Sequence, residues 1–128
     1  MNQTIEKTIL SNLLKNEPFT RKVVPFLKEE YFHDRVEKLI FTSIFDFVAK
    51  YNSLPPVDAL NITLSNASMS DDEFKHATDL VEEIDCEVDS NEDWLLEQTE
   101  KFCKDKAVYN AIMESIHIID GKSTSVKT

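Results

Sequence analysis

The 128-residue chain contains one glycine, four prolines and two cysteines. So few turn-forming residues exclude a fold built from many hairpins, and no window alternates apolar and polar residues as a half-buried strand does. The chain has neither a signal peptide nor a run of 18 apolar residues, which predicts a cytoplasmic location with reduced cysteines. We therefore expect an all-α fold, and the length fits one domain.

Basic residues are also scarce. The chain has 14 Lys and Arg against 24 Asp and Glu, which gives a net charge of −10. Such a surface repels nucleic-acid phosphates, and the two short basic stretches at 20–22 and 101–106 are expected to be solvated helix faces. The sequence therefore predicts that this domain does not bind nucleic acid directly.

No arrangement of residues predicts catalysis, a cofactor or a metal. Cys86 and Cys103 lack the spacing of a zinc site, and the acidic stretch 85–93 lacks the glycine and final glutamate of a calcium loop. The G-K-S-T at 121–124 imitates a phosphate loop without its first glycine. The three histidines fall on different predicted elements, with no nucleophile placed beside them. We expect no catalytic, cofactor-binding or metal-binding residues.

Apolar spacing predicts a compact bundle of six or seven helices that ends in a long projecting C-terminal helix. Apolar residues recur at helical spacing from Ile5 to Leu14. Between Tyr31 and Tyr51 they are dense enough to predict a helix buried nearly all round, with Phe47 in the stability core. The predicted elements cover about residues 3–16, 18–26, 28–32, 34–51, 57–66, 70–85 and 91–120.

Several of these elements begin or end with residues that favour a helix boundary. Pro18 suits a first helical turn, where an N–H has no partner within the helix. Asp34 can cap the next long helix, and Ser70 with Glu73 forms a predicted capping box. Gly121 stands where the residue after a helix often adopts a left-handed conformation.

The last predicted helix is about 45 Å long at 1.5 Å per residue. This length exceeds the diameter of so small a domain, so part of the helix is expected to project. In its first half we expect Trp94, Leu95, Phe102 and Cys103 to point inward. Nine of the thirteen residues from Ala107 to Ile119 are apolar, and a helix that is apolar on several sides must be covered on several sides.

Two interpretations of this apolar segment stay open. It can be a central helix of the monomer's own core, or it can be an interface between subunits. For the second interpretation we predict a seam of six residues along one side of the helix. They are Phe102, Tyr109, Ile112, Met113, Ile116 and Ile119.

The order of these motifs resembles a known family. The chain reads T-I-E-K-T-I-L-S-N-L-L at 4–14, Y-F at 31–32 before an aromatic-rich helix, and V-D-A-L-N-I-T-L at 57–64. The N-terminal domain of DnaB-type replicative DNA helicases has an E-x-x-I/V-L-x-x-L-L opening helix and the same succession. The similarity is greatest to helicases of large tailed phages of the T-even type. It continues through W-L-L-E-Q-T-E-K-F-C at 94–103 and covers about residues 3–120.

The resemblance implies a non-catalytic collar domain at 1–120, with 121–128 as the disordered start of an interdomain linker. The parent enzyme would be an ATP-dependent ring hexamer in the host cytoplasm, and its ATPase domain would lie outside this excised segment. The domain would pair subunits through its last helix and dock primase or a helicase-loading protein. A free-standing all-α adaptor that binds a protein partner through its C-terminal helix is the alternative.

Overall fold

The computed structural model describes residues 4–88 and 91–120, with side chains up to residue 118. These residues form six α-helices and one short 3-10 helix and contain no strand, which confirms the predicted all-α fold. The helices are α1 (Ile5–Lys15), α2 (Glu17–Val23), η1 (Glu29–Tyr31), α3 (Arg35–Tyr51), α4 (Val57–Ser65), α5 (Asp71–Ile84) and α6 (Glu92–Asp120).

Most helix boundaries lie within a residue or two of the predicted ones because local capping sets them. The Asp34 side chain accepts the N–H of Glu37 at 2.9 Å. Ser70 and Glu73 form a reciprocal capping box, as predicted. The exception is α2, which ends at Val23, three residues before its predicted end. Pro25 lacks the N–H that a continuing helix needs.

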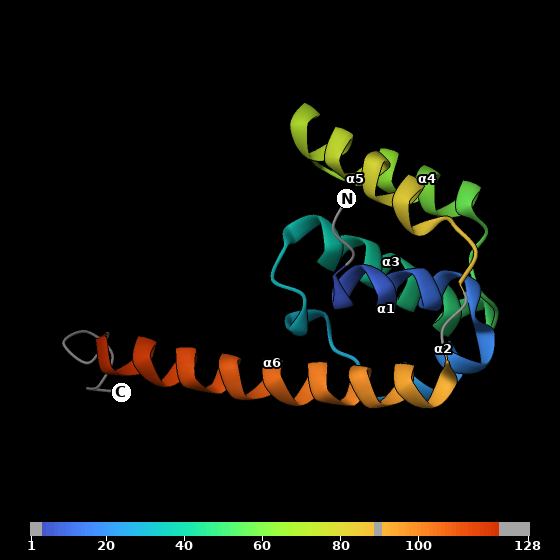
Figure 1. Cartoon of the computed structure of the whole chain (residues 1–128). Helices are drawn as coiled ribbons and strands as arrows, with labels where there is room; N and C mark the ends of the chain where they lie inside the picture. The colour runs from blue at the N-terminus through green and yellow to red at the C-terminus, as the bar shows by residue number, and fades with distance from the viewer. Residues whose placement is uncertain (1–3, 89–90, 121–128) are drawn as a thin grey trace.

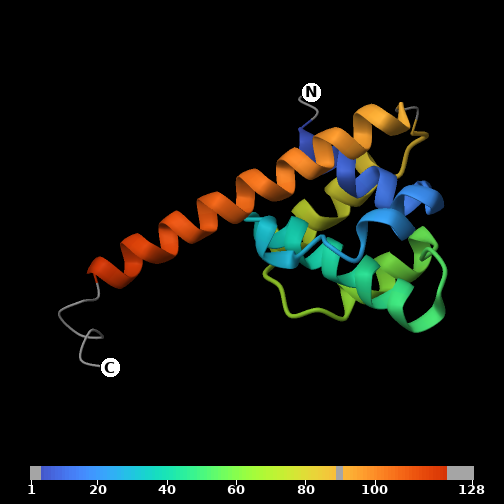
Figure 2. The same ribbon diagram turned by 90° about the horizontal axis from the view of Figure 1, so that it is seen from below.

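The helices pack in three layers (Figure 1). Helices α1 and α3 lie in the middle, with α4 and α5 on one side and α6 on the other. Among the described helices, α6 contacts only α1, α2 and η1. Figure 2 shows the consequence from below, where the second half of α6 extends far beyond the rest of the molecule.

The core lies between these layers. Its largest fully buried side chains come from every helix and from the segments around η1. They are Phe19, Phe32, Ile9, Leu10, Leu13, Ile40, Ile44, Leu60, Leu64, Ile84, Leu95 and Val23.

Helix α3 is buried on one side only, so the prediction of all-round burial is wrong. Val36, Ile40 and Ile44 are buried, but Tyr51 at the end of the helix is 56% exposed. Phe47 is only partly buried, and its ring lies 4.6 Å from the Tyr51 ring in a tilted arrangement outside the core. Helices α1, α4 and α5 and the short η1 contact α3, and they leave its outer face to solvent.

Candidate interaction surface on the last helix

The first half of α6 packs on the body of the domain. Leu95, Thr99 and Phe102 are buried on one face of the helix, and Cys103 packs partly against the core. These positions confirm the inward direction predicted for Leu95, Phe102 and Cys103. Trp94 was also predicted to point inward, and this is wrong, because its side chain is 47% exposed. One residue turns a helix by about 100°, which places Trp94 on the flank of the Leu95 face.

Contacts with the segment around η1 mark the point where α6 leaves the body. The Phe102 ring lies 5.4 Å from the Phe32 ring. The Asn110 side-chain amide donates to the backbone carbonyl of Glu30 at 3.0 Å, and its carbonyl oxygen is hydrogen-bonded to the His33 imidazole, also at 3.0 Å. Asn110 therefore fastens the helix just before it projects.

Every residue from Ala111 to Ile118 is exposed. The interpretation of this segment as a central core helix of the monomer is therefore wrong. The large apolar side chains from Val108 to Ile118 are about half exposed, although such residues are usually buried in soluble proteins. Their exposed fractions are 58% for Val108, 49% for Tyr109, 53% for Ile112, 45% for Met113, 45% for Ile116 and 56% for Ile118.

The six residues of the predicted seam lie in different surroundings. Tyr109, Ile112, Met113 and Ile116 are exposed along one side of the second half of α6, and we call these four residues the apolar face. Phe102 is only 5% exposed and belongs to the domain's own core. Ile119 lies in α6 but beyond the described side chains.

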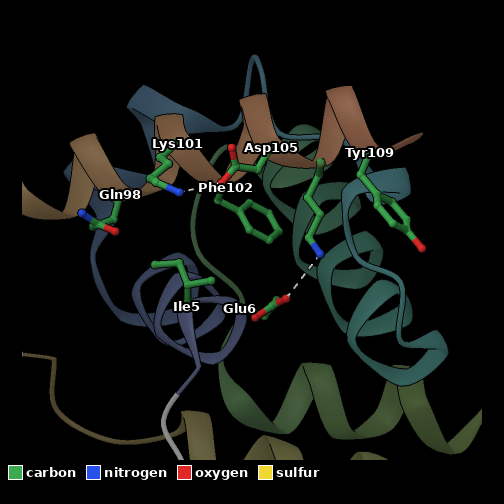
Figure 3. A pocket seen from close by; sticks show the side chains of 8 residues that line it. Ile5, Glu6, Gln98, Lys101, Phe102, Asp105 and Tyr109 are labelled. Carbon is green, nitrogen blue, oxygen red and sulfur yellow. Dashed lines mark hydrogen bonds and ion pairs between the residues drawn. The ribbon is translucent and has the colours of Figure 1, made fainter. Parts of the chain in front are cut away.

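A groove of about 380 Å³ lies between α6 and the start of α1 (Figure 3). The Phe102 ring points into it from α6, and Ile5 and Glu6 face it from α1. The rest of its lining comes from α6, including Tyr109, the first residue of the apolar face. Sequence reasoning missed the groove because its two walls are about a hundred residues apart in the chain.

A lysine bridges the two walls of this groove. The Lys106 ammonium lies 3.9 Å from the Glu6 carboxylate. It also lies 5.8 Å from the centre of the Phe102 ring and 5.9 Å from that of Tyr109. A cation over aromatic faces is attracted by their negative quadrupole. The lysine therefore reaches across the groove from α6 to α1, and its charge is matched locally.

The described residues contain no group of three or more His, Cys, Asp or Glu that could hold a metal ion. Burial raises the pKa of the Cys103 thiol to about 11, with a further contribution from Glu100. This thiol is therefore protonated at neutral pH and is a poor nucleophile. None of the described helices is long and apolar enough to cross a membrane. Among the described residues, the exposed apolar face is therefore the surface feature that best indicates a binding function.

Fold and surface together define an all-helical domain from which one long helix projects with an exposed apolar face. A sequence model of the DnaB-like helicase N terminal domain matches residues 1–91, so the chain belongs to that family. A DnaB-like replicative helicase of Enterobacteria phage T4 is 35% identical over 112 residues, which is 86% of this chain and 23% of that protein. The chain therefore spans less than a quarter of the length of that relative, and most of it matches the N-terminal domain that the family model describes.

Proposed function

We propose that this domain is the non-catalytic collar of a hexameric, ATP-dependent replicative DNA helicase and joins its subunits in pairs. The observation that carries the proposal is the half-exposed apolar face, which starts at Tyr109 beside the body and continues through Ile112, Met113 and Ile116 on the projecting part of the helix. Exposed apolar patches on soluble domains mark surfaces that other molecules cover. Family membership favours a second subunit as the covering molecule.

The energy of covering this face suits a reversible pair. Each of its four side chains still exposes about half its surface, so covering one contributes on the order of 1 kcal/mol. Two copies that cover each other's face would gain about 8 kcal/mol, against a cost of association of roughly 4–15 kcal/mol. These four residues alone therefore support only a weak pair, so the pairing that we expect of the isolated domain at micromolar concentrations needs further contacts. The ring of the parent enzyme would raise the effective concentration further.

Primase and a helicase-loading protein are the further partners that we propose, and the host cytoplasm is the proposed location. The face of α5 and the segment after it is acidic, and its exposed carboxylates suit a basic partner surface. The residues are Asp71, Asp72, Glu82, Glu83 and Glu87.

We propose no direct nucleic-acid binding by this domain, because its net charge of −10 opposes phosphate contacts. We also propose that the domain extends over 1–120 and that the linker begins at 121–128, which lie outside the described residues.

Light scattering on the wild type and on Ile112→Glu/Ile116→Glu tests the pairing. We expect the wild type to be a dimer or larger at micromolar concentrations and the double variant to be a monomer, because an unpaired carboxylate buried in an apolar seam costs several kcal/mol. The double variant should remain folded, since these two side chains lie outside the monomer core. A wild type that stays monomeric at high concentration contradicts the proposal.

Ile118→Glu is the matched control for the double variant. Ile118 is 56% exposed on the same helix, but two residues turn a helix by about 200°, which places it on the side away from Ile116. We expect this variant to pair as the wild type does. Loss of pairing here would mean that any added charge on the projecting segment disrupts association.

A further inference from the structure

A second groove, separate from the one beside α6, lies between α3 and the segment that leads into η1. Its volume is about 320 Å³, and its apolar lining consists of Leu27, Phe41 and Phe45. We call the cavity lined by these three side chains the α3 groove. Leu27 and Phe41 are almost fully buried, and Phe45 packs partly against the core. The two phenylalanine rings lie 5.9 Å apart. The apolar floor of the α3 groove is therefore held in place by the core beneath it.

Acidic side chains surround this apolar floor. Glu29, Glu30 and Asp46 line the α3 groove together with a single base, Lys28. All four are exposed, and none of them forms an ion pair with another residue in the described part of the chain. Three negative charges against one positive charge leave an excess of two negative charges at the rim. The rim therefore attracts a positively charged ligand.

The α3 groove continues along the helix into a cavity of about 360 Å³ that shares two of its lining residues. Charge in this second part is nearly balanced. Arg35 is paired with Glu73 at 2.7 Å, which leaves Lys38 and Glu29 as the other charges of its lining. The excess of negative charge thus lies at the end beside Asp46. From Arg35 to Asp46 the surface extends about 17 Å along α3, which is the length of about three helical turns.

The lining favours a helical occupant over an extended one. The side-chain hydrogen-bond donors of the α3 groove are the Thr42 hydroxyl and the Lys28 ammonium. The hydroxyl already donates to the backbone carbonyl of Lys38 at 2.8 Å, and Lys28 is exposed at the rim. An extended segment would place backbone carbonyls against apolar rings without donors, whereas a helix satisfies its own backbone groups. The described residues also contain no strand to which an extended partner could add.

We propose that the α3 groove binds a basic amphipathic helix of another protein. Apolar side chains of that helix, at a spacing of three and four residues, rest on Phe45 and the floor beside it. Its Lys or Arg side chains pair with Glu29, Glu30 and Asp46 at the rim. This surface is separate from the acidic face of α5, because it joins carboxylates to an apolar groove. It is also independent of the subunit pairing proposed above.

Charge selects a basic partner protein over a second copy of this chain. A second copy has a net charge of −10, and its exposed projecting segment at 111–118 contains no Lys or Arg. That segment would bring apolar side chains to the α3 groove but no positive charge to its rim. Nucleic acids and anionic membrane surfaces would bring further negative charge, which the carboxylates repel. A basic amphipathic helix supplies both the apolar side chains and the positive charge that the groove lacks.

A fluorescently labelled peptide of Leu, Ala and Arg is the probe, with Leu along one helical face and Arg beside it. A length of about 18 residues is chosen because shorter isolated helices are marginal in water. We expect anisotropy titrations with the wild type to give a micromolar dissociation constant. The same peptide with Glu in place of Arg should bind about tenfold more weakly or worse. So should a peptide of the same composition with Leu spread around the helix. Equal binding of the amphipathic and the spread peptide would show that charge alone attracts them, and the inference would be wrong.

Asp46→Lys tests where the peptide binds. We expect this variant to raise the dissociation constant about tenfold or more, because it places a like charge against the Arg residues of the peptide. Asp46 is exposed on α3, so the fold should be retained, and circular dichroism checks this. The matched control is Glu82→Lys, the same change of charge at an exposed acid of α5 that does not line the α3 groove. It should leave the dissociation constant within about twofold of the wild type, since salt limits the reach of one exposed charge. If the control weakens binding as much as Asp46→Lys does, net charge or the acidic face of α5 holds the peptide and the inference is wrong.

Ile112→Glu/Ile116→Glu separates this inference from the proposed function. The double variant should bind the peptide at least as well as the wild type does, because its changes lie on α6 and not in the α3 groove. Loss of peptide binding in this variant would place the peptide on the apolar face of α6 and would overturn the inference. A wild type that does not bind the peptide also overturns it, and a changed association state of Asp46→Lys in light scattering would then identify a second copy as the occupant. Failure of subunit pairing alone leaves the inference standing.

Discussion

Residues 92–110 and 111–118 belong to one helix, yet only the first of these segments has a body beneath it. In the first segment Phe102 is 5% exposed, and in the second Ile112 is 53% exposed. Both side chains are large and apolar. The difference shows that burial depends on what lies opposite a residue, and that a surplus of apolar residues without a covering element indicates a partner.

The largest expected effect is the loss of the Phe102 ring. Phe102→Ala should lower the free energy of unfolding by about 3–5 kcal/mol, because it leaves a cavity beside Phe32. Ile112→Ala should change it by about 0.5 kcal/mol or less, as exposed substitutions usually do, when both substitutions are made in an Ile116→Glu background that light scattering shows to be monomeric. Denaturant melts at one protein concentration compare them. Equal losses of unfolding free energy at the two positions would show that residues 92–110 and 111–118 do not differ in burial.

A smaller effect is expected at the junction of the two segments. Asn110→Ala removes the hydrogen bonds to Glu30 and His33, and each such bond contributes about 1 kcal/mol net. We expect a modest loss of stability and faster hydrogen exchange of α6 amides near residue 110. Ser115→Ala, at an exposed position of the projecting segment, should change neither. Unchanged exchange in Asn110→Ala would show that packing alone holds the junction.

The smallest expected effect concerns the carboxyl group of Glu37, which lies in the packed body of the domain and not in the projecting segment. Burial raises the pKa of Glu37 to about 7, with Glu6 and Asp34 adding to the rise. The folded state thus holds this proton more tightly than the unfolded state does, and stability falls as pH rises from about 4.5 to 7.

Glu37→Gln should therefore stabilise the protein by about 1 kcal/mol or less at pH 8, after discounting for solvent screening, and have little effect at pH 4. Thermal melts across this pH range measure it. Glu97→Gln, at an exposed carboxylate of α6, is the control and should leave the pH dependence unchanged. A variant that is destabilised at pH 8 would mean that the Glu37 carboxylate is favourably paired.

Local features of the fold were predictable because neighbouring residues determine them. Asp34 and Ser70 cap the helices that follow them, and each uses a side-chain oxygen that is three residues from the N–H it accepts. The apolar excess after Ala107 indicated a surface that needs covering, and the structure leaves it exposed. Long-range packing was harder to predict from the sequence. The wrong predictions for Trp94 and Phe47 both concerned which side of a helix packs on the rest of the domain.

By itself, the sequence determined the helices, their caps and the presence of one apolar stripe too long for the body, because helical periodicity and hydrogen bonding act over three or four residues. Only the tertiary structure decided where that stripe is covered. Tyr31 and Phe32 meet Phe102 at the edge of the core, and Ile5 and Glu6 of α1 form the second wall of the groove. These contacts join segments some 70 to 100 residues apart, and their positions follow from how the layers stack.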